Sequence, residues 1–127
     1  MTRSGADYIR AIRDGRAVYL NGEKVEDVTT HPAFAEVVKT VANLYDIAND
    51  PANRELMTFP SSQDGRPVNR CYLIPRTPED LIARRNAHKC WADAMYGLLG
   101  RSPDHVASFF AGFAGAASAP LAMALGL

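Results

Sequence analysis

Several absences narrow the functions that this sequence can support. Its 14 Lys and Arg residues equal its 14 Asp and Glu residues, so no net charge attracts nucleic acid or an anionic membrane surface. No His/Cys cluster has metal-ligand spacing, and no glycine-rich phosphate loop occurs. No Ser, Cys or paired-carboxylate arrangement for hydrolysis is complete either. We therefore expect no nucleic-acid partner, no membrane partner and no metal.

Cysteine is also scarce. Cys71 and Cys90 are the two cysteines of the chain, and they lack CxxC spacing. No secretory signal precedes the first charged segment, from Arg3 to Arg16. The sequence therefore predicts two free thiols in a reduced, cytoplasmic protein.

The chain has enough apolar residues for a core, since 47% of its 127 residues are hydrophobic and 22% are charged. The run from Phe109 to Leu127 carries no charge. Ala, Gly and Pro120 make it a poor membrane span, so we expect it to be surrounded by protein. Residues 1–127 are thus predicted to be incomplete at the C-terminus, as the front part of a longer polypeptide. The alternative is a short form that buries this tail against another chain.

Local patterns predict a mainly α fold with one small β-hairpin. Ser4 is placed to cap a first helix that ends at Asp14-Gly15. Residues 17–25 read as a hairpin around Asn21-Gly22, a dipeptide suited to a type I′ turn. A core helix ending before Pro51 has apolar residues at helical spacing: Phe34, Val37, Val38, Val41, Leu44 and Tyr45. Residues 53–76 are expected to form a long structured loop.

The longest helix is predicted over about 78–99. Thr77 is a cap residue, Pro78 fits the first helical position, and the carboxylates of Glu79 and Asp80 meet the positive end of the helix dipole. Gly100 is the expected left-handed stop. The segment "GRSPDH" then reads as a helix end followed by a helix start, with a final helix from about 103.

Two polar residues fall on the apolar stripe of this long helix. At about 100° per residue, Arg84 and His88 share that stripe with Leu81, Ala92, Met95 and Leu99. A guanidinium facing a core costs several kcal/mol unless acceptors meet it, which makes a dedicated partner the expectation. Being one turn apart, Arg84 and His88 can reach the same point in space.

Two interpretations of this pair stay open from geometry alone. In the structural one, Arg84 forms a buried salt bridge with an acid such as Asp46 or Asp80, and His88 donates to a main-chain carbonyl. In the functional one, Arg84 holds an oxyanion and His88 exchanges a proton in a ligand pocket. The other histidines have simpler roles: His31 is expected in a turn, and His105 is expected to be solvated.

Three segments resemble the N-terminal region of the 4-hydroxyphenylacetate 3-hydroxylase family. They are "AVYLNGEKVEDVTTHPAF", "LYDIANDP" and "IPRTPEDLIARRNAHKCWADAMYGLLGRSPDHVASFFAGFAG", in order within about residues 4 to 115. The family consists of oxygenase components of two-component flavin monooxygenases. The resemblance implies that residues 1–127 are the N-terminal helical domain of such an oxygenase, whose whole fold is similar to that of the acyl-CoA dehydrogenases.

The resemblance also implies an activity. The family hydroxylates a phenol ortho to its hydroxyl group, using O2 and reduced FAD supplied by a separate flavin reductase. A phenolic substrate, a reductase and a homo-oligomer are therefore the expected partners. The family's long helix carries an Arg and, four positions later, a Tyr near the substrate hydroxyl. This implies Arg84 and His88 as catalytic and substrate-binding residues, with His in place of Tyr, and it implies no particular residue for FAD.

Two further expectations complete the comparison with this family. Dehydratases of the superfamily hold an iron-sulfur cluster with closely spaced cysteines, whereas Cys90 has no cysteine four residues away, which argues against that branch. The alternative function is a truncated, non-catalytic form that serves as an oligomerisation or partner-binding domain.

Overall fold

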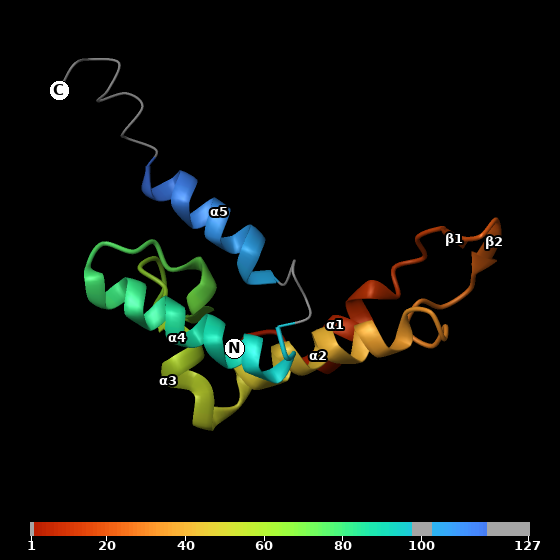
Figure 1. The fold of residues 1–127 in the computed structure, drawn as a ribbon, viewed down its shortest axis with the longest axis horizontal. Helices are drawn as coiled ribbons and strands as arrows, with labels where there is room; N and C mark the ends of the chain where they lie inside the picture. Colours follow the sequence, from red (N-terminus) through yellow and green to blue (C-terminus); the bar gives the residue numbers. More distant parts are fainter. Residues whose placement is uncertain (1, 98–102, 117–127) are drawn as a thin grey trace, which may run out of the picture. The chain divides into compact units, whose positions relative to one another are not determined.

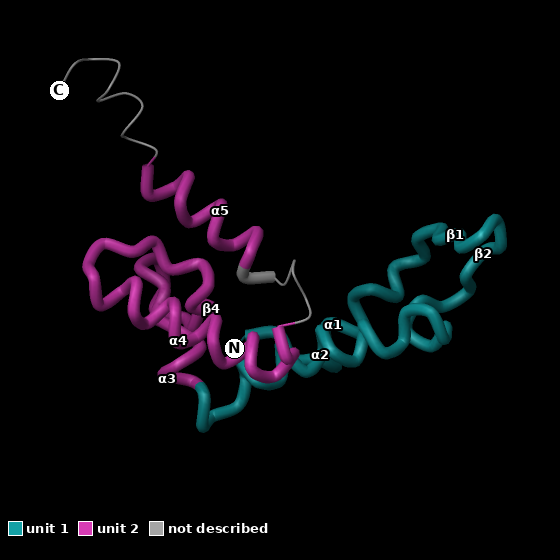
Figure 2. Tube along the Cα trace, in the orientation of Figure 1, with its two compact units in different colours: residues 1–53 teal, residues 54–127 magenta. Residues whose placement is uncertain are grey.

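A computed structural model describes residues 2–97 and 103–116, which belong to two compact units, residues 1–53 and 54–127 (Figure 2). The described chain is mainly helical, with two small antiparallel hairpins (Figure 1). This confirms the predicted fold class and adds a hairpin to it. The assignment of residues 1–127 to a single domain stays a prediction.

Unit 1 is built on two helices that pack together, α1 (Gly5–Ile12) and α2 (Ala35–Asn49), followed by the short 3₁₀ turn η1 (Pro51–Asn53). Ser4 caps α1 as predicted: its Oγ accepts from the Asp7 backbone N–H at 3.1 Å. The predicted end of the core helix before Pro51 is also confirmed. The buried residues of α2 are Val38, Ala42, Leu44 and Ala48. Val37 was predicted in the core but is 53% exposed, because the packing partner covers one side of the helix.

The crossing of α1 and α2 depends on Gly5. A Cβ atom at this position would lie 2.5 Å from both the Ala42 carbonyl oxygen and Asp46 Oδ2. The backbone N–H of Gly5 also donates to Asp46 Oδ1 at 2.8 Å. The two helices therefore approach too closely for any side chain here.

We expect Gly5→Ala to lower the free energy of unfolding by about 1–3 kcal/mol, the usual cost of forcing extra atoms into a packed contact. Gly112→Ala is the matched control, because Gly112 is also helical but a Cβ there meets nothing within 4 Å. That control should stabilise by up to about 1 kcal/mol, the helix propensity difference. Chemical denaturation of both variants measures the effect, and equal midpoints would contradict the close crossing.

The predicted first hairpin is present. Strands β1 (Val18–Leu20) and β2 (Glu23–Val25) pair antiparallel, with Val18 opposite Val25. Asn21 and Gly22 have φ angles of 53° and 86°, as a type I′ turn requires. Val25 is the buried residue of this hairpin.

Unit 2 contains a second hairpin where the sequence predicted a loop. After helix α3 (Arg54–Met57), strand β3 (Thr58–Pro60) pairs with β4 (Pro67–Asn69), and the 3₁₀ turn η2 (Arg70–Tyr72) follows. Arg70 fixes this arrangement, because its guanidinium donates to the carbonyls of Glu55, Leu56 and Thr58 at 2.6–2.9 Å. These bonds join residues 12 or more positions apart, so no local pattern announces them.

Helix α4 (Pro78–Ala94) starts as predicted. Thr77 Oγ1 accepts from the Asp80 N–H at 3.2 Å, while the Thr77 N–H donates to Asp80 Oδ2 at 3.1 Å. The backbone N–H groups of Arg76 and Thr77 hold the pKa of the Asp80 carboxyl below its usual value. The N-terminus of this helix is therefore satisfied by its own capping box.

The predicted end of this helix at residue 99 was wrong, since α4 ends at Ala94. The Gly97 N–H donates to the Ala92 carbonyl at 2.9 Å and the Tyr96 N–H to that of Asp93 at 3.3 Å, which is a Schellman motif. Tyr96 and Gly97 both have positive φ, 54° and 67°. The stop was misplaced because apolar periodicity continues through Leu98 and Leu99. Gly100, the predicted stop, lies outside the described residues.

The final helix, α5 (Pro103–Gly115), begins at the predicted position. Its buried residues Ala107 and Ala111 give it a small-residue face, and α5 packs on η2. None of the helices in the described part of the chain is both long and apolar enough to cross a bilayer. Most of the uncharged tail, residues 117–127, lies outside the described residues.

Candidate functional site

The packed face of α4 carries both residues singled out from the sequence. Ala87, Trp91 and Met95 are buried on it, with 1%, 4% and 7% of their surfaces exposed. Arg84 and His88 complete the same face at helical spacing and are half-buried. Their predicted placement on the inner side of the helix is confirmed.

The predicted stripe was nevertheless wrong in its centre. Leu81, placed on the inner side from the sequence, is 57% exposed, and Ala92 is exposed too. The face is turned towards Trp91, because burying the large indole contributes more than burying a leucine in the first turn. Leu99, also assigned to the stripe, lies outside the described residues.

Arg84 is held by neutral acceptors. Its Nη2 donates to the Cys71 carbonyl at 3.2 Å and to Ser108 Oγ at 3.0 Å, so the guanidinium links η2 to α5. Its Nε is buried and has no hydrogen-bond acceptor among the described residues. Both observations point to a cation with unused capacity to bind an acceptor.

The expected salt bridge of Arg84 to Asp80 is not formed. Asp80 belongs to the capping box of α4. Asp46, the other acid considered, lies in unit 1, where it accepts the Gly5 N–H. Within residues 2–97 and 103–116, no ion pair includes Arg84. A half-buried positive charge without a carboxylate is the arrangement that an anionic ligand can complete.

His88 follows Arg84 by one turn on the same face. Its Nε2 atom is shielded from solvent, so a proton held there would not exchange freely with bulk water. This position is compatible with the hydrogen-bonding role implied for it. That role stays a prediction.

A hollow on α5, which we call the aromatic hollow, was missed from the sequence. It is lined by His105, Ser108, Phe109, Gly112 and Phe113. Phe109 stacks on Phe113 with ring centroids 6.4 Å apart, and His105 meets Phe109 edge-on at 5.0 Å. His105 is exposed, as predicted, but it also borders this site. The i, i+3, i+4, i+7, i+8 spacing of the lining residues was the available signal.

Ser108 belongs to both features. It lines the aromatic hollow, and its Oγ accepts the hydrogen bond from Arg84. The site therefore combines an apolar, ring-lined wall with a polar group backed by a positive charge. Such a combination suits an aromatic ligand that carries an oxyanion.

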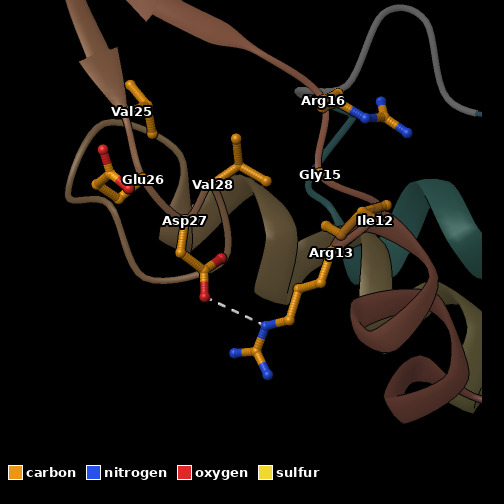
Figure 3. Close-up of a pocket in the computed structure, with 8 residues that line it drawn as sticks. All are labelled: Ile12, Arg13, Gly15, Arg16, Val25, Glu26, Asp27 and Val28. Atoms are coloured by element: carbon orange, nitrogen blue, oxygen red, sulfur yellow. Dashed lines mark ion pairs between the residues drawn. The ribbon is translucent and has the colours of Figure 1, made fainter.

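A hollow in unit 1, between α1 and the segment after β2, has a different character (Figure 3). Its Arg13 Nε lies 3.2 Å from Asp27 Oδ2, and Arg16 is paired with Asp14. The hydrogen bond from Arg16 lowers the pKa of Asp14 to about 2. Because each of these arginines is already matched by an acid, we assign no anion site here.

The described residues give little support for a metal or flavin site. No group of three or more His, Cys, Asp or Glu side chains in the described part of the chain could hold a metal ion. The N-termini of α1 and α4, where a flavin pyrophosphate could bind, are occupied by their own capping boxes. Cys71 and Cys90 are thiols, as predicted, and burial raises the pKa of the Cys90 thiol.

The family model described as "4-hydroxyphenylacetate 3-hydroxylase N terminal" matches residues 4–123 of this chain. The chain belongs to this family. The resemblance seen in the sequence is thereby confirmed over nearly the whole chain.

Three similar proteins place the chain within the family. The 4-hydroxyphenylacetate 3-monooxygenase oxygenase component of Thermus thermophilus is 43% identical over 92% of this chain and 24% of the relative. The oxygenase component of 4-nitrophenol 2-monooxygenase of Rhodococcus sp. is 40% identical over 84% of this chain and 21% of the relative. A crystal structure of a 4-hydroxyphenylacetate 3-monooxygenase oxygenase component, complexed with FAD and 4-hydroxyphenylacetate, has a TM-score of 0.76. It is 46% identical and covers 82% of this chain and 22% of that one.

The chain thus spans about a quarter of the length of these family members, at their N-terminal part. The similar solved structure confirms the fold expected from the resemblance.

Proposed function

We propose that this chain is the N-terminal, substrate-side part of a reduced-FAD-dependent monooxygenase that hydroxylates a phenol ortho to its hydroxyl group. Its family relatives are oxygenase components that act on phenols, which supports this proposal. The observation that carries it is the half-buried guanidinium of Arg84, which lacks a carboxylate among the described residues and donates to Ser108 at the wall of the aromatic hollow.

In this proposal the aromatic hollow receives the substrate ring. The rings of Phe109 and Phe113 offer surfaces for stacking, and the apolar lining excludes water from the bound ring. The phenolic oxygen lies at the polar side of the hollow, where Ser108 stands in front of Arg84. His88 is the second hydrogen-bonding group for that oxygen, taking the place of the family's tyrosine.

Arg84 favours the ionised form of the substrate. A nearby positive charge lowers the pKa of a phenol, and a phenolate is a stronger nucleophile than the neutral phenol. The chemistry supplied by reduced FAD is the activation of O2 for transfer of one oxygen atom to the ring. We propose that a flavin reductase delivers this FAD and that the complete oxygenase is a homo-oligomer. No residue of this chain is assigned to FAD.

Filling the aromatic hollow tests this placement of the substrate. Gly112→Leu adds a side chain where a Cβ meets only open space, so it should occupy the hollow without disturbing the helix. In the complete oxygenase we expect KM for the phenol to rise about tenfold or more, since roughly 1–3 kcal/mol of ring burial is lost. Gly112→Ala, which leaves the hollow open, is the control. An unchanged KM in Gly112→Leu would place the substrate elsewhere.

The alternative function is a non-catalytic, partner-binding form. It is favoured by the exposed apolar stripe on α5, where Val106, Phe109, Phe110 and Phe113 are 51–70% exposed. The two functions differ in chemistry. A monooxygenase forms a hydroxylated phenol with reduced FAD, whereas the partner-binding form does not.

A further inference from the structure

We infer that Ser108 is a substrate-binding residue, which carries the positive charge of Arg84 to the aromatic hollow and donates a hydrogen bond to the phenolate oxygen. This inference rests on the proposed function and assigns it a residue that the sequence did not indicate. It also explains how Arg84, on the packed face of α4, can act on a ligand bound against α5.

The hydrogen-bond inventory of Ser108 supports this role. A serine hydroxyl has one proton to donate and two lone pairs that accept. One lone pair of Ser108 Oγ accepts from Arg84 Nη2 at 3.0 Å. No bond donated by the Ser108 hydroxyl is present among the described residues, so its proton is available. Because the residue lines the aromatic hollow, that proton can be directed at a ligand there.

The charge on Arg84 makes Ser108 a better donor than an isolated hydroxyl. A hydroxyl that accepts from a cation is polarised, and hydrogen bonds in such chains strengthen one another. The Cys71 carbonyl accepts from the same Nη2 and keeps the guanidinium in place. The geometry therefore presents a fixed O–H group rather than a mobile charge.

This arrangement favours one class of ligand. An O–H donor backed by a cation stabilises an oxygen that carries negative charge, so phenols that can ionise should bind better than their methyl ethers. The ring position is set by the aromatic hollow and the oxygen position by Ser108. Ser108 is then a determinant of specificity for phenols over ring compounds of the same shape without an ionisable oxygen.

The test measures the ionisation of a bound phenol. 4-Nitrophenol is titrated into the complete oxygenase with reduced FAD under nitrogen, and the absorbance of its phenolate is followed against pH. For Ser108→Ala we expect the pKa of the bound nitrophenol to rise by about one unit, a tenfold change in the phenolate ratio. Ser108→Thr keeps the hydroxyl and should restore most of the wild-type value. Ser62→Ala, at an exposed serine, should leave it unchanged.

The outcomes separate this inference from the function on which it rests. If Ser108→Ala binds nitrophenol with the wild-type pKa while Arg84→Ala does not, the inference is wrong and the proposed function stands. If Ser108→Thr behaves like Ser108→Ala, the hydroxyl is not the active group and the inference also fails. If the wild-type oxygenase neither binds nor ionises any phenol, the proposed function itself fails.

Discussion

Replacing Arg84 by alanine in the complete oxygenase should reduce the rate of phenol hydroxylation about 10²-fold to 10³-fold. This is the usual effect of removing a group that stabilises developing or fixed negative charge at a reacting oxygen. Oxidation of the reduced flavin by O2 should continue, because no contact of Arg84 among the described residues points to a role in that step. The measurement pairs oxygen consumption with chromatographic quantification of the hydroxylated product.

Arg85→Ala is the matched control for this substitution. Arg85 is the neighbouring arginine of α4 but is exposed, so its removal alters the charge of the helix without touching the site. It should hydroxylate at the wild-type rate. The assignment of Arg84 fails if both variants behave alike, or if Arg84→Ala still converts the phenol normally. A folding measurement on both variants is needed, because Arg84 also links η2 to α5.

The second large effect is expected at His88. His88→Phe keeps a ring of similar size but removes both nitrogens, and we expect hydroxylation to fall about 10-fold to 100-fold. This corresponds to the loss of one hydrogen bond to a charged oxygen. Steady-state kinetics at several pH values give the measurement, since the wild-type rate should show an ionisation that His88→Phe lacks.

His88→Tyr separates a working substitution from a loss of function. Tyrosine can hydrogen-bond a phenolic oxygen as histidine does, so this variant should retain hydroxylation and lose the histidine ionisation. If His88→Phe is as active as the wild type, His88 has a packing role only. If His88→Tyr gains activity over an inactive wild type, His88 marks a chain that has lost the reaction.

Local sequence signals predicted the parts of the fold that depend on neighbouring residues. Thr77 and Asp80 form the predicted capping box, and Asn21-Gly22 forms the predicted turn. The second hairpin was missed because Arg70 fixes it through carbonyls that are distant in sequence. The end of α4 was misplaced because a Schellman motif needs one residue with positive φ, and Tyr96 rather than a glycine supplies it.

The candidate site shows the same division. Helical spacing was sufficient to place Arg84 and His88 on the packed face of α4. It could not supply the partners of Arg84, since the Cys71 carbonyl and the Ser108 hydroxyl lie on other elements, 13 and 24 residues away. An acid was expected because charge pairing is the common solution for a buried guanidinium. The use of neutral acceptors instead is what leaves its charge available.

The central claim is that this chain forms the phenol side of a monooxygenase. It is tested most directly by supplying the complete oxygenase with reduced FAD, a phenol and isotopically labelled O2, and analysing the product by mass spectrometry. The account predicts an ortho-hydroxylated phenol that carries one labelled oxygen atom. Formation of no hydroxylated product, or of a product whose new oxygen comes from water, would contradict it.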